Sequence, residues 1–524
     1  MSRWINVGEI VRINASLYPD KMGAKDLKRS MTFKEWNDRS CRLANALLGL
    51  GLQKGDRFAI LAYNRVEWME IYTAAAKAGL VAVPIMFRLA PAEYEYILKD
   101  SGSKAFIVEQ PFIKGADSIR ADCPEIKHYV YLGEGPTPDK YEGYEELIAQ
   151  ASPEEPTVEV HHRDIWTFMY TSGTTGKPKG VVRNHESYIA FYILNVAEMG
   201  FRRDDLGLLV MPMCHVNSIF YSYSFTYAQA GLCVYNMVSF DPEHLLKTLA
   251  EEKITFTSLV PTHYIMMLAL PDEVKNKYDV SCVRKLLCSS APARKDTKLG
   301  ILAHFKNSQL YEAYGSTEAG LVTLLQPEDQ MKKLGSIGRE IFGTDQIKLF
   351  DESGREVPQG EVGELFSRGP AFFTEYWNLS QVTKDAFRRE YFSAGDMARK
   401  DEDGYYYLVD RKKNMIITGG ENVYPSEVEN VVGGHPAVKD VAVIGVPDPK
   451  WGESIKAVVI LHEGYQGSPQ LEKEIIDFCR DKVAGFKKPK TVDFIPETEM
   501  PRTGTGKILH RALRERYGKW SDQR

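Results

Sequence analysis

The chain has 524 residues, of which 44% are apolar and 26% charged, and its formal net charge at pH 7 is −5. This length exceeds one ordinary hydrophobic core, so we expect a globular protein of at least two domains. The negative charge excludes a general nucleic-acid binder, which needs a basic face, and no apolar run reaches the roughly 20 residues of a membrane-spanning helix.

The start of the chain and its cysteines predict a cytoplasmic protein. Residues 1–6 show no basic stretch followed by an apolar core, so we expect no secretory signal. The cysteines are odd in number, scattered and without a CxxC pair, which is typical of reduced thiols and unlike a disulfide framework or a zinc site. They are Cys41, Cys123, Cys214, Cys233, Cys282, Cys288 and Cys479.

Short, unalternated apolar runs in the first half of the chain predict buried strands, and the segments between them carry apolar residues at helical spacing. The predicted strands are residues 58–63, 80–86, 105–108, 129–132, 208–211, 232–235 and 256–260, and the predicted helices of the first 150 residues are 32–50, 65–77 and 90–99. Strand–helix alternation of this kind favours α/β layers with largely parallel sheet.

Two later regions have a different pattern. From about residue 335, the runs 347–350, 364–366, 397–399 and 405–409 predict strands joined by Ser-Gly and Asp-Gly turns, which indicates a small antiparallel barrel or sheet. After residue 410, strands at 438–446 and 456–461 and a helix at 470–482 are predicted.

We therefore expect an α/β fold with two domains. The large N-terminal domain, residues 1–410, would consist of layered α/β subdomains plus a small β-barrel-like subdomain. The smaller C-terminal domain, residues 411–524, would be of α+β type. The basic segment 410–414 lies at this junction and is a candidate linker.

The densest chemical signal is the segment 170–180, Tyr-Thr-Ser-Gly-Thr-Thr-Gly-Lys-Pro-Lys-Gly, which lies between a predicted strand at 165–170 and a helical pattern at 185–197. Glycines allow close approach of the backbone, hydroxyls and amides donate hydrogen bonds, and lysines neutralise charge. The segment therefore predicts a loop around phosphate oxygens, with a surface turn as the alternative. It is not a Walker loop, because only two residues separate Gly173 from Gly176 and Pro178 follows Lys177.

This loop resembles the signature loop of the adenylate-forming superfamily, which comprises acyl-CoA synthetases, aryl-CoA ligases, peptide-synthetase adenylation domains and beetle luciferases. Other segments resemble further motifs of that superfamily in the same order along the chain. They are 314–318 for the second nucleotide motif, 391–396 for the ribose segment, 409–416 for the hinge, 419–429 after the hinge, and 501–508 for the C-terminal catalytic loop. The resemblance spans residues 30 to 510.

The resemblance implies a site for ATP and Mg²⁺. Lys507 would place its charge between the acid's carboxylate and the α-phosphate, and Tyr314 would lie against adenine. Glu318 would ligate Mg²⁺, a hard ion that prefers oxygen ligands. The implied catalytic residues are Lys507, Glu318, Thr317 and His215; the implied nucleotide-binding residues are Thr171, Ser172, Gly173, Thr174, Thr175, Gly176, Lys177, Tyr314, Gly315, Asp396 and Arg411; and the implied metal ligands are Glu318 and Thr175.

The resemblance also implies a second half-reaction with coenzyme A. The C-terminal domain would rotate about Lys413, and Gly419, Gly420 and Glu421 would line a channel for the pantetheine arm. A turn before the helix at Pro425 is the alternative role of the two glycines. The implied acyl pocket is neutral and aromatic, with His215 as its gate; its residues are His215, Val216, Asn217, Tyr221, Ser289, Ser290 and Ala291.

These features favour an AMP-forming acyl-CoA synthetase that acts on a small-molecule carboxylic acid, ATP and CoA. The acid would be medium-chain, alicyclic or aromatic, and a carnitine- or crotonobetaine-type acid stays open. Other hypotheses are a freestanding adenylation enzyme that loads a carrier protein, a luciferase-like oxygenase, and a nucleotide-binding regulator, whose expected signature is loss of Lys507 or Glu318. The physiological direction, acetylation of Lys507, and the choice between monomer and homodimer stay open.

Overall fold

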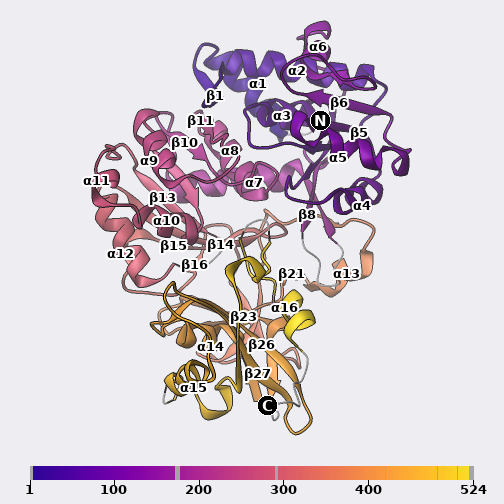
Figure 1. Ribbon diagram of the computed structural model, residues 1–524. Helices are drawn as coiled ribbons and strands as arrows, with labels where there is room; N and C mark the ends of the chain where they lie inside the picture. Colours follow the sequence, from indigo (N-terminus) through magenta and orange to yellow (C-terminus); the bar gives the residue numbers. More distant parts are fainter. Residues whose placement is uncertain are drawn as a thin grey trace. The chain divides into compact units, whose positions relative to one another are not determined.

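The computed structural model describes residues 4–171, 178–289, 293–418, 421–480, 482–503 and 506–518. Backbone contacts divide the chain into two compact units (Figure 1). Unit 1 comprises Met1–Ile347 and Ser367–Phe392, and unit 2 comprises Lys348–Phe366 and Ser393–Arg524. The predicted domain boundary at residue 411 falls inside unit 2, and the role of this segment as a hinge stays a prediction.

Unit 1 contains two large sheets. One has eight strands in the order β19-β9-β8-β4-β3-β5-β6-β7, and the other has nine in the order β16-β15-β14-β13-β12-β10-β11-β1-β2. The strands of the first are β3 (Arg57–Leu61), β4 (Val81–Ile85), β5 (Ser103–Glu109), β6 (His128–Leu132), β7 (Glu142–Gly143), β8 (Ile165–Thr171), β9 (Lys179–Asn184) and β19 (Glu375–Tyr376). Those of the second are β1 (Met22–Asp26), β2 (Ser30–Thr32), β10 (Leu206–Leu209), β11 (Gly231–Val234), β12 (Phe256–Leu259), β13 (Lys285–Ser289), β14 (Gln309–Ser316), β15 (Gly320–Leu325) and β16 (Arg339–Glu340).

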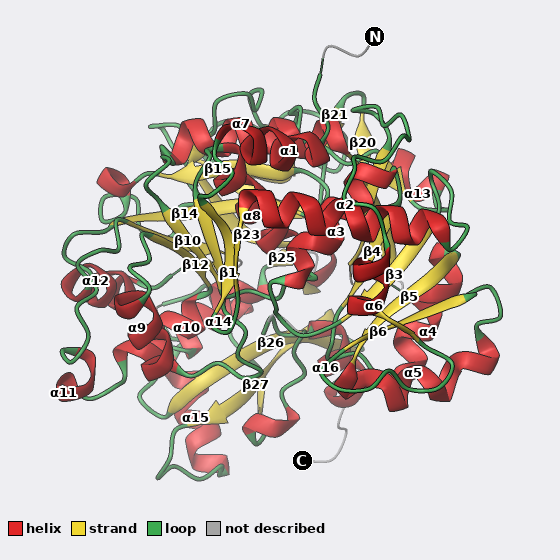
Figure 2. Cartoon of the chain, turned by 90° about the horizontal axis from the view of Figure 1, so that it is seen from above, coloured by secondary structure: helices red, strands yellow, loops and turns green. Residues whose placement is uncertain are grey.

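Helices cover these sheets, and Figure 2 shows α3 and α8 between the two. The helices are α1 (Val7–Leu17), α2 (Phe33–Gly49), α3 (Glu67–Ala78), α4 (Pro91–Ser101), α5 (Ile113–Ile119), α6 (Tyr144–Gln150), α7 (His185–Met199), α8 (Val216–Tyr227), α9 (Pro242–Glu251), α10 (Pro261–Leu268), α11 (Asp272–Lys275), α12 (Lys295–His304) and α13 (Ser380–Asp385). A short hairpin, β20 (Phe387–Arg388) and β21 (Tyr391–Phe392), completes the unit.

An aromatic core joins the sheets. Every residue of α3 is buried. Tyr72 of α3 packs on Trp166 of β8, and Trp166 also packs edge-on against Tyr223 of α8, with ring centroids 5.9 and 5.4 Å apart. Most residues of α3 are apolar, and its three charged residues are paired: Glu67 with Arg65, Glu70 with Arg39 and Lys77 with Glu155. The helix can therefore lie buried between the two sheets. The α/β fold expected from the apolar runs is confirmed, and each strand and helix predicted within residues 32–132 and 208–260 is present.

Unit 2 begins with an open antiparallel sheet in the order β17-β18-β22-β23. These strands are β17 (Lys348–Phe350), β18 (Val362–Phe366), β22 (Asp396–Lys400) and β23 (Tyr406–Arg411). Of the two alternatives expected here, the antiparallel sheet is confirmed and the barrel is not, because β17 and β23 end the sheet and do not pair with each other. Four strands of three to six residues are too few and too short for the tilt that closure requires.

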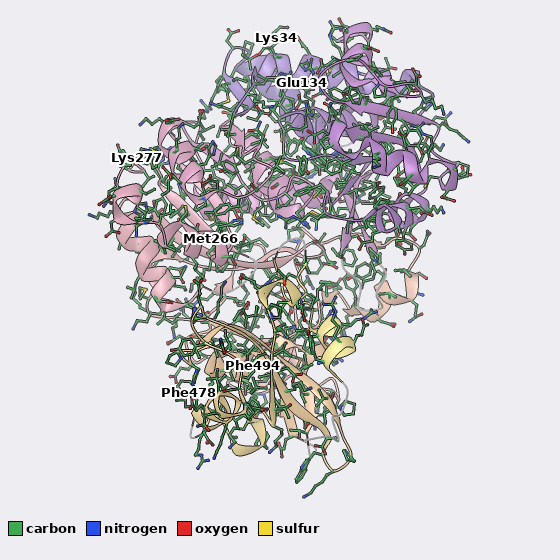
Figure 3. All side chains as sticks on the ribbon, in the orientation of Figure 1. Lys34, Glu134, Met266, Lys277, Phe478 and Phe494 are labelled. Carbon is green, nitrogen blue, oxygen red and sulfur yellow. The ribbon has the colours of Figure 1, made fainter. Side chains whose placement is uncertain are left out.

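The rest of unit 2 is a second sheet with helices on both faces. Its strands are β24 (Ile416–Thr418), β25 (Glu421–Val423), β26 (Val438–Asp448), β27 (Gly452–Leu461) and β28 (Thr491–Phe494), and its helices are α14 (Pro425–Val432), α15 (Pro469–Phe478) and α16 (His510–Tyr517). Val441 and Val443 of β26 pack with α14 and α15, whereas Ala442 and Ile444 pack with Leu513 of α16. Phe494 of β28 packs on the first of these clusters (Figure 3). This two-residue period is what a strand between two helical layers requires.

None of the helices in the described part of the chain is both long and apolar enough to cross a membrane.

A buried ion pair in unit 1 gives a stability prediction. Lys298 and Glu312 form an ion pair with side chains 0% and 6% exposed, and Glu312 also accepts a hydrogen bond from the backbone N–H of Ala293 at 2.7 Å. We expect Glu312→Gln to lower the free energy of unfolding of unit 1 by about 3–5 kcal/mol, because it leaves the Lys298 charge buried without a carboxylate. Urea unfolding followed by tryptophan fluorescence measures this, since Trp36, Trp68 and Trp166 are fully buried in the same unit.

The matched control is Glu251→Gln, which breaks the exposed pair of Lys247 and Glu251 at 4.0 Å. That change should alter the free energy by less than about 0.5 kcal/mol. Equal effects of the two changes would contradict the assignment of the Lys298–Glu312 pair as a structural element.

Candidate functional site

The predicted phosphate loop connects β8 and β9, which form an antiparallel hairpin. Thr171, the last residue of β8, pairs with Lys179, the first residue of β9, so the two ends of the loop are fixed side by side. The predicted residues Ser172, Gly173, Thr174, Thr175, Gly176 and Lys177 lie outside the described residues. Of the loop residues predicted to bind the nucleotide, Thr171 is the one that the structure describes.

The second nucleotide motif forms the tight turn between β14 and β15. A β-carbon at Gly315 would lie 2.0 Å from the carbonyl oxygen of Gly320, and Gly320 itself has a φ of +72°. Gly315 is required because a β-carbon would clash, and Gly320 is favoured because its φ is positive. The Ser316 hydroxyl accepts the backbone N–H of Ala319 at 3.0 Å. This turn presents Thr317 and Glu318, both half-buried, at the end of the nine-stranded sheet, with Tyr314 three residues before Thr317.

Glu318 is fixed by residues that the sequence did not predict. The Tyr376 hydroxyl donates a hydrogen bond to Oε1 of Glu318 at 2.9 Å, and the backbone N–H of Phe373 donates to the Glu318 carbonyl at 2.7 Å. The ammonium of Lys179 lies 4.1 Å from the centroid of the Tyr376 ring. Tyr376 reaches this position because β19 pairs with β9, and its place in the sequence gives no sign of that pairing.

The predicted acyl-site residues lie at the start of α8. His215 is the N-terminal cap of this helix, with extended backbone (φ −101°, ψ 148°), and Val216 is its first residue. The Asn217 amide donates to the hydroxyls of Ser258 at 3.1 Å and Ser289 at 3.4 Å. The structure therefore brings Asn217 and Ser289 together and adds Ser258, from the neighbouring strand β12, which the sequence did not predict.

The other predicted acyl-site residues are not part of this group. Tyr221 is buried, with its ring centroid 5.1 Å from that of Phe256 and also packed on Phe191 and Phe201. It belongs to a buried aromatic cluster, and its role in an acyl pocket stays a prediction. Ser290 and Ala291 lie outside the described residues.

The turn that leads into α8 is held by Asn64, at the end of β3. The Asn64 side chain accepts the backbone N–H of Met213 at 2.8 Å and donates to the carbonyls of Met211 at 3.1 Å and of Val210 and Tyr235 at 3.4 Å each. The Tyr72 hydroxyl donates to the Met213 carbonyl at 2.9 Å. One amide thus joins the end of the eight-stranded sheet to two strand ends of the nine-stranded sheet, beside His215.

In unit 2 the predicted ribose-binding residues form an ion pair. Asp396 opens β22 and faces Arg411 across the ladder to β23, with Arg411 Nε 2.8 Å from Asp396 Oδ1. Asp396 is buried, and the N–H of Lys412 donates to the Gly395 carbonyl at 2.9 Å. The β-ladder register therefore brings together two residues that are 15 positions apart in the sequence.

Lys507 lies on a short loop before α16. The Lys507 N–H donates to the Thr503 hydroxyl at 3.1 Å, the Thr503 N–H donates to the Lys507 carbonyl at 2.7 Å, and Arg502 forms an ion pair with Asp440 of β26. Although Lys507 is exposed overall, its pKa is lowered, first by loss of hydration at the ammonium and next by repulsion from Arg411, whereas Asp396 acts in the opposite direction. The lysine and the ribose-binding pair therefore share one electrostatic environment.

The predicted hinge is tied to the C-terminal helix. Arg514 of α16 donates from Nη1 to the Lys413 carbonyl at 3.0 Å and from Nη2 to the Asn414 carbonyl at 2.7 Å. Asp410 accepts the N–H of Ser426 at 3.0 Å. Glu421 is exposed at the start of β25, and the predicted channel residues Gly419 and Gly420 lie outside the described residues.

The described residues contain no cluster of three or more His, Cys, Asp or Glu side chains that would hold a metal ion alone. Glu318 nevertheless suits Mg²⁺, which commonly takes one or two carboxylates and completes its shell with phosphate oxygens and water.

Comparison with known proteins gives the family of the chain. The family described as AMP-binding enzyme matches residues 11–377, and the AMP-binding enzyme C-terminal domain matches residues 427–507. The long-chain-fatty-acid–CoA ligase FadD13 of Mycobacterium tuberculosis is 36% identical over 521 residues, 98% of each chain. The feruloyl-CoA synthase of an Amycolatopsis species is 35% identical and covers 96% of this chain and 97% of its own.

Among solved structures, the anthranilate CoA ligase AuaEII in complex with anthranoyl-AMP has a TM-score of 0.89 at 29% identity, covering 99% of this chain and 98% of its own. A fatty acyl CoA synthetase of Mycobacterium tuberculosis has a TM-score of 0.77 at 35% identity, covering 98% of both chains. The chain therefore belongs to the family of AMP-binding enzymes.

Proposed function

We propose that the protein is an AMP-forming acid–thiol ligase, which joins a neutral carboxylic acid to coenzyme A through an acyl-adenylate. The observation that carries this proposal is the shared environment of Lys507, Asp396 and Arg411. Asp396 can accept hydrogen bonds from ribose hydroxyls, while Lys507 and Arg411 supply positive charge next to them. This arrangement suits a nucleotide that binds with its ribose at Asp396 and its α-phosphate, where the acid attacks, near the positive charges.

In the first half-reaction the acid's carboxylate oxygen attacks the α-phosphorus of ATP. A bond forms between that oxygen and phosphorus, the bond to the β-phosphate bridging oxygen breaks, and pyrophosphate leaves with the electron pair. The carboxylate is already ionised at neutral pH, so no general base is required. Lys507 and Arg411 repel each other when the site is empty of anions, and the anionic phosphate relieves this repulsion.

We assign Glu318, together with Thr175, as the protein ligands of Mg²⁺. The bond from Tyr376 orients the Glu318 carboxylate, and Thr317 on the same turn would donate to the α-phosphate. A bound Mg²⁺ would neutralise part of the phosphate charge.

In the second half-reaction the thiol sulfur of CoA attacks the acyl carbonyl, the carbon–sulfur bond forms, and AMP leaves. We assign Lys413 as the pivot between the two half-reactions and Gly419, Gly420 and Glu421 as the channel for the pantetheine arm. The exposure of Lys413 and Glu421 supports this, as do the two hydrogen bonds from Arg514, which are few enough to break and re-form.

The acid that we propose is medium-chain, alicyclic or aromatic. Asn217, Ser258 and Ser289 form an uncharged polar group at the first turn of α8, the helix that His215 caps, and Tyr221 of the same helix packs on Phe256. The described part of this group offers no carboxylate to hold an amino substituent. We also propose a cytoplasmic location, because all seven cysteines are unpaired and six of them are buried.

The test of the function is an assay with Mg-ATP and CoA against propionate, octanoate, benzoate, cyclohexane carboxylate and carnitine. AMP and the CoA thioester should rise together for one class of acid. We expect Lys507→Ala to lower acid-dependent ATP–pyrophosphate exchange by about 100-fold or more, because a charge at the reacting phosphate is lost. The control is Lys473→Ala, an exposed lysine of α15 in the same unit.

The outcomes separate the hypotheses. Pyrophosphate exchange without any CoA thioester would indicate an enzyme that loads a carrier protein. A preference for carnitine would identify a zwitterionic substrate. ATP binding without either reaction, for every acid, would point to a nucleotide-binding regulator.

A second prediction concerns the acid-site turn. Asn64→Ala removes the bonds to Met211 and Met213, so we expect the KM for the acid to rise about tenfold while the KM for ATP changes little, since loss of one to two hydrogen bonds costs about 1–2 kcal/mol. The control is Asn45→Ala, whose amide also bonds two carbonyls, of Ser152 and Glu154, but at the surface. Equal changes in both KM values would contradict a role in acid binding.

A third prediction concerns the hinge. Arg514→Gln loosens the carbonyls of Lys413 and Asn414 and so destabilises the arrangement in which Lys507 lies near the ribose-binding pair. We expect pyrophosphate exchange to fall about fivefold relative to thioester formation from a supplied acyl-adenylate, because each hydrogen bond is worth roughly 1 kcal/mol. Arg511→Gln, on the same helix but paired with exposed Glu515, should leave this ratio unchanged. A fall in both reactions by the same factor would reject the role of Arg514.

A further inference from the structure

Arg183 of β9 carries a buried charge that the mechanism above does not use. Its side chain is fully buried, and no Asp or Glu among the described residues forms an ion pair with it. Burying an unpaired guanidinium costs several kcal/mol, so an apolar residue of the same size would give a more stable strand at this position. The presence of arginine here calls for a role other than packing.

The contacts of the guanidinium converge on the turn that carries Thr317 and Glu318. Nη1 donates to the carbonyls of Thr317 at 2.6 Å and Glu318 at 3.4 Å, and Nη2 donates to the carbonyl of Ala371 at 2.6 Å. Three carbonyl dipoles thus replace water around the charge. Burial lowers the pKa of Arg183, while Tyr188, Tyr192 and Glu318 act in the opposite direction.

The guanidinium lies over two aromatic rings. Its central carbon is 4.8 Å from the ring centroid of Tyr188, on α7, and 5.1 Å from that of Phe220, on α8. Lysine could not reproduce this arrangement, since it lacks both the planar fork and the stacking faces. Arg183 therefore connects the β14–β15 turn to α8, the helix that His215 caps.

The direction of these hydrogen bonds fixes the orientation of the turn. In a trans peptide the C=O and N–H bonds point in opposite directions, so a carbonyl of Thr317 that points at Arg183 turns the N–H of Glu318 away from it. The bond from Tyr376 fixes the carboxylate of the same residue separately. Backbone and side chain of Glu318 are therefore positioned by two different residues on neighbouring strands.

We propose that Arg183 is a positioning residue for adenylation, which holds the Thr317–Glu318 turn in the orientation that receives the nucleotide and couples this turn to the acyl-site helix through Phe220. The inference rests on the proposed function for its catalytic part. Its structural part, the anchoring of the turn, stands on the hydrogen bonds alone.

The experiment compares Arg183→Met and Arg183→Lys with Arg120→Met in the same unit. Arg120 shares two contact types with Arg183, since it lies 3.6 Å from the Tyr129 ring centroid and donates to the Lys140 carbonyl at 3.2 Å, on a segment with no predicted site residue. It differs in being partly exposed and in its ion pair with Asp117. Each variant is assayed below its own unfolding temperature for acid-dependent pyrophosphate exchange and for thioester formation from a supplied acyl-adenylate.

We expect Arg183→Met to slow exchange by about 100-fold, as a displaced reacting group does, and to change thioester formation less than about threefold. The rate of pyrophosphate exchange in Arg183→Lys should lie between the rates in Arg183→Met and in the unchanged protein. Arg120→Met should leave the rates of both reactions unchanged. Parallel losses of both reactions in Arg183→Met, or equal behaviour of Arg183→Met and Arg120→Met, would overturn the proposal.

A second readout does not depend on the reaction. Amide hydrogen exchange should accelerate at residues 315–320 in Arg183→Met and stay unchanged there in Arg120→Met. If the unchanged protein adenylates no acid, the proposed function fails, and this exchange measurement still decides whether Arg183 anchors the turn.

Discussion

Repulsion between anions is the constraint on which the site depends. The carboxylate of the acid and the triphosphate of ATP repel each other, and they react only where positive charge and hydrogen-bond donors offset that repulsion in advance. In the proposed reaction, Lys507 and Arg411 of unit 2 supply this charge, and they are close enough to affect each other. In unit 1 we assign the same role to the turn between β14 and β15 and to the hairpin in which Thr171 and Lys179 are paired. Paired strands hold Arg411 of β23 and the hairpin ends Thr171 and Lys179, which limits the entropy that these groups would lose on binding.

The sequence predicted the layered fold because the strands are short apolar runs and the helices have clear spacing. It did not decide between a barrel and a sheet for the later strands, since closure depends on which distant strands pair, and nothing local encodes that β17 and β23 remain apart. The motif residues Asp396 and Arg411 do meet, because they belong to adjacent strands. The helix ends were less well placed: the helix predicted at 470–482 ends at Phe478.

The site residues that the sequence did not predict share one property: each acts across a long sequence separation. Tyr376 bonds Glu318 from 58 residues away, Asn64 bonds Met213 from 149, and Arg183 bonds Thr317 from 134. A motif records residues that are close in sequence, whereas these contacts depend on sheet order. Arg183 left one local sign, a charged residue within the buried run of β9, and a buried arginine in a strand is a reason to look for its partners.

The turn before α8 also bears on the fate of the intermediate. An acyl-adenylate is a strong electrophile and would acylate any thiolate within reach, including one of the enzyme's own. Cys214 is the immediate neighbour of His215, but burial raises its pKa to about 12, and its sulfur lies 3.5 Å from that of Met86. A thiol in this state is a poor nucleophile at neutral pH. In the proposed reaction, this burial would protect Cys214, which lies beside the predicted acyl site, from self-acylation and keep the acyl group available for the thiol of coenzyme A.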